Sequence, residues 1–151
     1  GNGMSTHVRQ QLRDAAVTAL TGLTTTGARV YGSRAYNMQD ANIPGLRIFT
    51  PSESSQSIEM GSTRIRERSL TLAIEICVKA NTGYADTADL IAKEVEIALD
   101  NDNTLGGRCK MIEPRDYTEE LSGEGEHPIA IGRMQFEVTY HARKGSPDVA
   151  A

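Results

Sequence analysis

The chain is poor in the residues that build aromatic cores or covalent cross-links. It has no Trp, two Phe and two Cys among 151 residues. Two cysteines exclude a disulfide-rich scaffold, and Cys77 and Cys109 both fall in strand-like segments, which favours buried, reduced thiols over a disulfide. No apolar run approaches the ~18 residues that a membrane span needs, so we expect no membrane contact.

Charge and length restrict the class of protein further. The formal net charge is −4, from 16 Lys and Arg against 20 Asp and Glu. A net acidic chain is not suited to coating nucleic acid, and we expect no sequence-specific nucleic-acid binding. The length is that of one domain. We interpret residues 1–3 as a cloning scar, residues 4–141 as a single domain and residues 142–151 as a frayed polar tail.

Periodic patterns predict the secondary structure. Apolar side chains at three- and four-residue spacing predict helices over residues 7–23 and 86–99. Strict alternation predicts long strands over residues 69–78 and 134–140, each with one packed face and one face in solvent. Shorter strands are expected over residues 29–31, 46–50 and 108–117. The predicted core residues are Leu12, Leu20, Leu72, Ile74, Ile76, Val95, Phe136 and Val138.

This order of elements predicts an α+β fold. We expect a mostly antiparallel sheet of about four to five strands, with two amphipathic helices packed on one face. The Ser-rich segment 51–63 lacks a periodic pattern and predicts an exposed loop, mobile in the free subunit and ordered in an assembly. Its apolar residues Ile58 and Met60 are candidates for docking on a partner. The acidic segment 118–126 predicts a second loop.

Motifs that carry chemistry are missing from the sequence. It has neither a Gly-rich phosphate loop nor a Gly-x-Ser-x-Gly elbow. His7, His127 and His141 lack the short spacing of a metal pair. We therefore predict no catalytic residue, no cofactor and no metal site.

Two charge clusters of opposite sign remain. Arg64, Arg66 and Arg68 alternate along an extended segment, so their side chains point the same way. The acidic segment carries Glu119, Glu120 and Glu124. Each cluster is either a solvated strand end or loop, or a contact patch through which copies of the chain join head to tail into a ring. The candidate assembly contacts are therefore Arg64, Arg66, Arg68, Glu119, Glu120, Glu124, Ile58 and Met60.

The order and spacing of these segments resemble a known family. The most suggestive local pieces are Asn42-Ile43-Pro44-Gly45-Leu46-Arg47-Ile48, where a Pro precedes a strand, and the closing Met134-Gln135-Phe136-Glu137-Val138-Thr139-Tyr140. With the opening helix, the long strand over residues 69–78 and the helix over residues 86–99, the chain from Met4 onward resembles phage tail terminator proteins of the lambda type, also called minor tail protein U.

The resemblance implies a structural, non-enzymatic protein of the virion tail, assembled in the host cytoplasm. Such proteins form a homohexameric ring on the head-proximal end of the tail tube, end its polymerisation and provide the surface that joins the head. The implied partners are other copies of the chain, the major tail tube protein and a head completion or connector protein, with DNA passing through the ring. Another head–tail neck or tail-completion protein of similar fold and a small enzyme of unknown chemistry are the alternatives.

Overall fold

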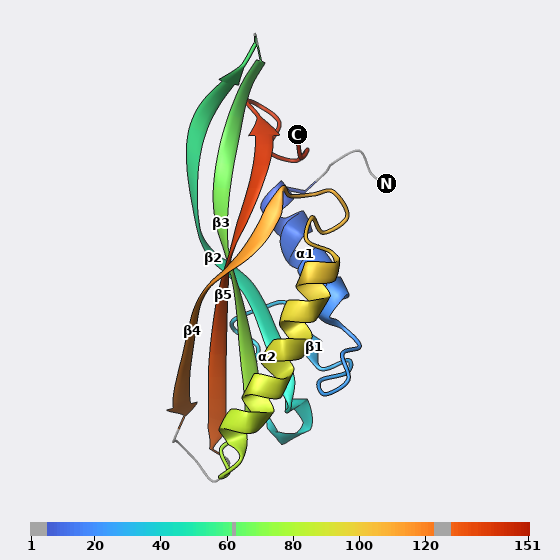
Figure 1. The fold of residues 1–151 in the computed structure, drawn as a ribbon, viewed down its shortest axis with the longest axis vertical. Helices are drawn as coiled ribbons and strands as arrows, with labels where there is room; N and C mark the ends of the chain where they lie inside the picture. Colours follow the sequence, from blue (N-terminus) through green and yellow to red (C-terminus); the bar gives the residue numbers. More distant parts are fainter. Residues whose placement is uncertain (1–5, 62, 123–127) are drawn as a thin grey trace.

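The computed structural model describes residues 6–61, 63–122 and 128–151. Over these residues the fold is α+β, as predicted, with two α-helices, one short 3-10 helix and a five-stranded sheet (Figure 1). The elements are α1 (Val8–Leu20), β1 (Val30–Tyr31), η1 (Asp40–Asn42), β2 (Gly45–Met60), β3 (Thr63–Lys79), α2 (Tyr84–Asn101), β4 (Met111–Ser122) and β5 (Ile129–Arg143).

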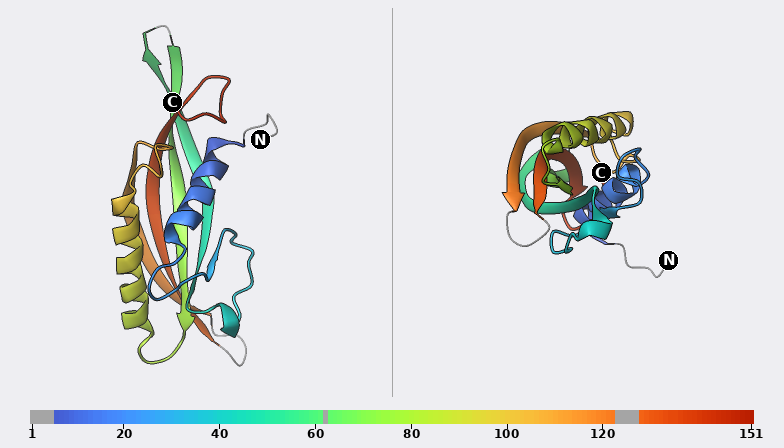
Figure 2. Two further views of the ribbon diagram at one scale, coloured as in Figure 1. Left: turned by 90° about the vertical axis from the view of Figure 1, so that its right-hand side faces the viewer. Right: turned by 90° about the horizontal axis from the view of Figure 1, so that it is seen from below.

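The sheet has the strand order β1-β2-β3-β5-β4. β1 pairs with β2 in parallel, and the other neighbouring pairs are antiparallel. Both helices lie on one face of the sheet, as the two amphipathic stripes predicted (Figures 1 and 2). α1 packs against β1 and β2, and α2 packs against β3 and β5. The strands twist strongly at mid-height, where β2 and β4 each carry a bulge.

The core lies between the helices and the sheet. Each helix buries one stripe, and alternate residues of β3 and β5 meet these stripes because successive strand side chains point to opposite faces. All eight predicted core residues are buried.

The second face of β3 is not fully in solvent, contrary to the sequence expectation. Ala73, Glu75 and Cys77 are buried on that face. The strand register explains Glu75, because it stands between Arg47 of β2 and Arg133 of β5. Arg47 Nη2 lies 2.9 Å from Glu75 Oε1 and Arg133 Nε lies 3.1 Å from Oε2, so two cations compensate the buried carboxylate.

The predicted loop over residues 51–63 is wrong. β2 runs to Met60 and β3 begins at Thr63, and their residues pair from Ser52↔Thr71 to Met60↔Thr63. The two strands form a long hairpin that extends beyond the helices (Figures 1 and 2). Its only large apolar residues are Ile58, Met60 and Ile65, so the alternation that marks a half-buried strand is missing from its sequence.

Two further boundaries differ from the predictions. β4 continues to Ser122, so Glu119 and Glu120 are strand residues and not loop residues. The expected frayed tail packs back onto the domain: the Val8 backbone N–H donates to the Pro147 carbonyl, and the Ala151 N–H donates to the His141 carbonyl. Residues 1–3, the presumed cloning scar, lie outside the described residues.

Truncation of Ile74 tests the core assignment. Ile74 is fully buried, so Ile74→Ala should lower the free energy of unfolding by about 2–5 kcal/mol. Ile97 lies on the outer side of α2 with 51% of its surface exposed, and Ile97→Ala should change it by less than about 0.5 kcal/mol. Urea denaturation of both variants measures the difference, and equal losses would contradict the burial of Ile74.

Candidate functional site

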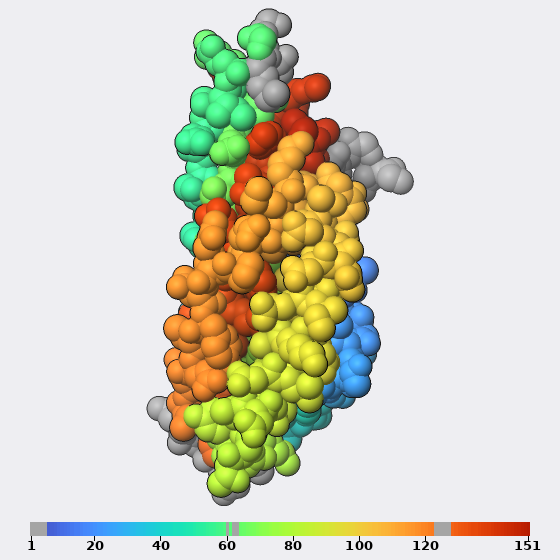
Figure 3. Space-filling view, in the orientation of Figure 1, coloured from blue at the N-terminus to red at the C-terminus, as the bar shows by residue number. Residues whose placement is uncertain are grey.

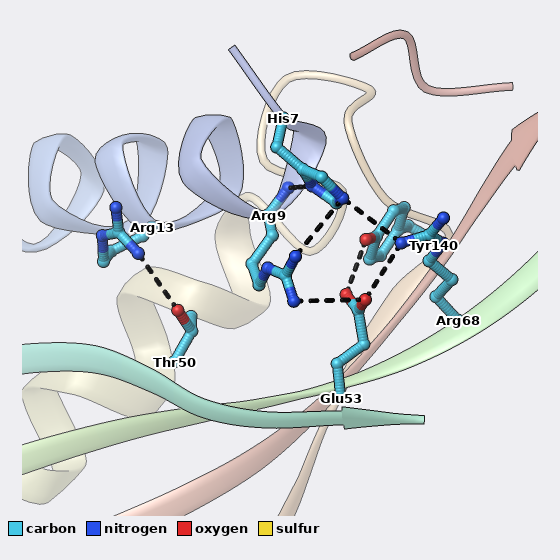
Figure 4. Close-up of polar contacts among 7 residues, drawn as sticks. All are labelled: His7, Arg9, Arg13, Thr50, Glu53, Arg68 and Tyr140. Atoms are coloured by element: carbon cyan, nitrogen blue, oxygen red, sulfur yellow. Dashed lines mark hydrogen bonds and ion pairs between the residues drawn. The ribbon is translucent and has the colours of Figure 1, made fainter. Parts of the chain in front are cut away.

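Four chain segments meet where the hairpin leaves the helix-covered part of the sheet. We call this cluster the Glu53 junction; it consists of Glu53 from β2, Arg68 from β3, Tyr140 from β5, Arg9 from α1 and His7 just before α1 (Figure 4). The register brings the strand residues together, because Arg68 pairs with Ser55 on one side and with Tyr140 on the other. Glu53 lies two residues from Ser55 and therefore shares its face of the sheet.

The Glu53 carboxylate is the acceptor at the centre of the junction. Tyr140 Oη donates to Oε1 at 2.6 Å, and Arg68 Nη1 donates to Oε2 at 3.1 Å. Arg9 Nη1 lies 3.5 Å from the same Oε2. The Glu53 side chain is only 8% exposed, so these donors replace the water that the charge has lost. Burial, followed by the hydrogen bond to Glu53, raises the pKa of Tyr140, which therefore remains a neutral donor.

His7 joins the junction to the first helix. Its Nδ1 accepts from the Arg9 backbone N–H at 2.9 Å and caps α1. Its Nε2 lies 3.2 Å from Arg68 Nη1 and 3.4 Å from Arg9 Nη2. Burial lowers the pKa of His7, and the charges of Arg9 and Arg68 lower it further, against opposing effects of Glu53 and Asp148. The imidazole is therefore held neutral, as its capping bond requires.

The three predicted arginines do not form one exposed patch. Arg64 is exposed and Arg66 is half-buried, whereas Arg68 is largely buried and bonded to Glu53. Arg68 is therefore neither a solvated strand-end residue nor part of an exposed contact patch, contrary to both interpretations of the arginine row. Ile58 pairs across the hairpin with Ile65, and both are half-buried. The side chain of Met60 and the whole of Glu124 lie outside the described residues.

The two charge clusters lie far apart within one molecule. Arg66 pairs with Ala142 and Glu119 pairs with Gly132, ten residues away along β5. At about 3.3 Å per strand residue, the clusters are roughly 33 Å apart. The described acids Glu119 and Glu120 are exposed on β4, at the end of the sheet opposite the hairpin. The two clusters therefore cannot contact each other within one molecule, and any contact between them must join separate molecules.

A groove separates α2 from β4 on the helix-covered side (Figure 3). Its volume is about 460 Å³, and Met134 and Phe136 of β5 form part of its lining. Tyr117 lies at its β4 side and passes close over Gly132, where any side chain would collide with the phenol. Burial, followed by a hydrogen bond to Glu119, raises the pKa of Tyr117 and keeps the phenol protonated.

No sequence pattern marks the junction. Glu53 lies in the Ser-rich segment. In the sequence His7 is only the first residue of a predicted helix, and Tyr140 is an ordinary residue of a predicted strand. Their proximity results from tertiary structure. The two thiols are free and buried, and burial raises the pKa of both Cys77 and Cys109 to about 11, so they are poor nucleophiles.

The described residues contain no group of three His, Cys, Asp or Glu side chains arranged to hold a metal ion. Over the same residues, neither helix has the length and apolar character needed to cross a membrane.

Comparison with known proteins gives a distant structural likeness. No protein-family model matches the chain, and no curated protein matches it. Among solved structures, a chain in the virion of a native gene transfer agent particle is similar, with 21% identity and a TM-score of 0.49. The match covers 90% of this chain and 92% of that chain.

Neutralising Glu53 tests the central role of its carboxylate. Glu53→Gln keeps the shape of the side chain but removes the negative charge to which Arg68 and Tyr140 donate. It should therefore lower the free energy of unfolding by about 1.5–3 kcal/mol. Glu137 forms an exposed ion pair with Arg115, and Glu137→Gln should cost less than about 1 kcal/mol. Thermal unfolding measures the stability of both variants, and equal losses would show that the Glu53 junction adds nothing to stability.

His7 should make stability depend on pH. Because its pKa in the folded state lies below the usual 6.5, the unfolded chain binds more protons as the pH falls through this range, and the folded state loses stability. His7→Asn keeps a capping side chain without a titrating group. Between about pH 7 and pH 5, the free energy of unfolding of the His7→Asn variant should fall less than that of the unmodified protein. Parallel curves would contradict this assignment.

Proposed function

We propose that this chain is a structural, non-enzymatic protein of a phage-like virion that caps the head-proximal end of a tail tube as a ring. In this role it ends tube polymerisation and provides the surface to which the head joins. Its partners are other copies of itself in a homohexameric ring, the tube protein on one side and a head completion or connector protein on the other.

The long β2–β3 hairpin is the observation that carries the proposal. It projects past the helices as an arm, in which β3 still pairs with β5 as far as Ile65 and only the tip beyond that pair is two-stranded (Figure 1). Apart from the largely buried Arg68, the described side chains of the arm beyond Glu53 are exposed or half-buried. The two-stranded tip is mostly polar and contributes little to the core of its own subunit. Such an arm is suited to contacts with neighbouring molecules, and the Glu53 junction fixes its base to the domain.

The order of elements supports the same role. The sequence resembles lambda-type tail terminators in an opening helix, a Pro before a strand, a long strand, a second helix and a closing strand. The structure contains α1, Pro44 directly before β2, then β3, α2 and β5 in that order. These segments build a single sheet with one helical layer, so they act together as one unit.

The separation of the charge clusters supports axial contacts. The arm carries Arg64 and Arg66 at one end of the sheet, far from Glu119 and Glu120, so the arm can meet a partner that the acidic strand does not touch. Partners above and below a ring would meet opposite ends of each subunit. We therefore propose that Arg64 and Arg66, with Ile58 and Met60, contact the tail tube.

Measurement of the assembly state tests the ring. Light scattering after size exclusion should give a mass six times the 16.4 kDa of the chain, alone or after addition of tail tubes. Electron microscopy should show the ring at one end of each tube, and tubes grown in its presence should stop lengthening. A protein that stays monomeric and does not bind tube ends would contradict the proposal.

Charge reversal on the arm tests the tube contact. Arg64→Glu with Arg66→Glu should abolish capping of tubes and leave the fold and the ring unchanged, because neither arginine has an ion pair among the described residues. Each exposed pair contributes only about 0–1 kcal/mol, but the loss repeats in every subunit. Normal capping by this variant would identify the arginines as a solvated strand end.

A further inference from the structure

A cationic hollow lies at the outer edge of β2. Arg13 of α1, the backbone turn at Gly32 and Ser33, Arg34, and Phe49 to Pro51 of β2 line a volume of about 500 Å³. Arg13 Nη1 donates to Thr50 Oγ1 at 3.2 Å, and the Arg34 guanidinium lies 5.3 Å from the centre of the Phe49 ring. Every lining residue is neutral or cationic.

The two arginines stand on opposite sides of the strand edge. Arg13 comes from α1, which covers one face of the sheet. Arg34 lies over Phe49, which pairs with Ala73 and so points to the other face, away from the buried stripe of Leu72 and Ile74. Among the described residues, β1 pairs with β2 only at Leu46 and Arg47, so the edge beside the hollow has no partner strand.

The opposite edge of the sheet has the complementary charge. β4 is the last strand, and within the described part of the chain it pairs only with β5. Its exposed acids point to both faces: Glu119 pairs with Gly132 on the helix-covered face, and Asp116 and Glu120 pair with Gln135 and Ile131 on the other. The single arginine of this strand, Arg115, is already paired with Glu137.

We propose that the hollow at Arg13 and Arg34 binds the acidic β4 edge of a second copy of this chain, and that this contact closes the ring. This inference rests on the proposed function and assigns the surface through which the ring forms. An edge strand with acids on both faces fits between two cations that stand on either side of an edge. Because the two surfaces differ and lie at opposite edges, the contact is head-to-tail and repeats from subunit to subunit.

Paired charge reversals test the contact. Arg13→Glu with Arg34→Glu, and separately Glu119→Lys with Glu120→Lys, should each reduce the ring to monomers. The acidic-strand variant changes two exposed side chains and removes one exposed hydrogen bond, from Tyr117 to Glu119, so it tests the contact even if the Arg13 change disturbs α1. A matched control, Arg108→Glu with Lys110→Glu, changes two exposed cations before β4 and should leave the ring intact.

Mixing the two variants gives the decisive result. In an equimolar mixture each reversed hollow meets a reversed strand, so alternating rings with an even number of subunits should form again. Light scattering measures the mass, and raising salt from 0.1 to 1 M should weaken assembly because the screening length falls from about 10 to about 3 Å.

Three outcomes would overturn the inference. The inference is wrong if rings still form after either charge reversal. It is also wrong if both variants fold but their mixture stays monomeric. In these two cases the proposed function still holds if the unmodified protein caps tubes. An unmodified protein that forms no ring, alone or with tubes, would overturn both.

Discussion

The central strand β3 is the constraint on which the rest of the structure depends. It pairs with β2 and β5 over most of its length, and it is the only strand whose middle residues are buried on both faces among those described. Its apolar stripe receives α2, and its opposite face holds Glu75 between Arg47 and Arg133. A one-residue slip of β3 would move Glu75 into the helix-facing core and Ile74 out of it. The buried carboxylate therefore fixes the register as strictly as the apolar stripe does.

The two halves of the sheet are held by different forces. Over the helix-covered half, burial of apolar side chains dominates. Beyond Glu53 the arm has few apolar contacts and depends on its backbone ladder, on the pairing of β3 with β5 as far as Ile65 and on the Glu53 junction. Because the junction also includes the N-cap of α1 and a residue of β5, the base of the arm is fixed to two further elements and not only to its own two strands.

The helices, the long strands and the whole predicted core could be predicted from the sequence, because burial on one face produces a periodic pattern of apolar residues. The part of β2 over residues 51–60 could not, because its mostly polar sequence has no alternation, and it is a strand through its pairing with β3. Arg68 shows the same limit: its spacing from Arg64 and Arg66 is that of one exposed row, but Glu53 lies close only in the folded chain. Backbone hydrogen bonds hold the packed tail, and no side-chain pattern in the sequence predicts them.

The sheet offers two independent directions for assembly. Its ends, marked by the arm and by the end of β4, face along the strands, whereas its edges, at β2 and β4, face across them. A contact between ends stacks molecules, and a contact between unlike edges places them side by side, where a constant rotation closes a ring. A subunit that must both join its own copies and cap a tube needs these directions to be separate, because the same patch cannot serve both. The hollow at Arg13 and Arg34 lies at an edge and Arg64 lies on the arm, so the two proposed contacts can form in one particle at the same time.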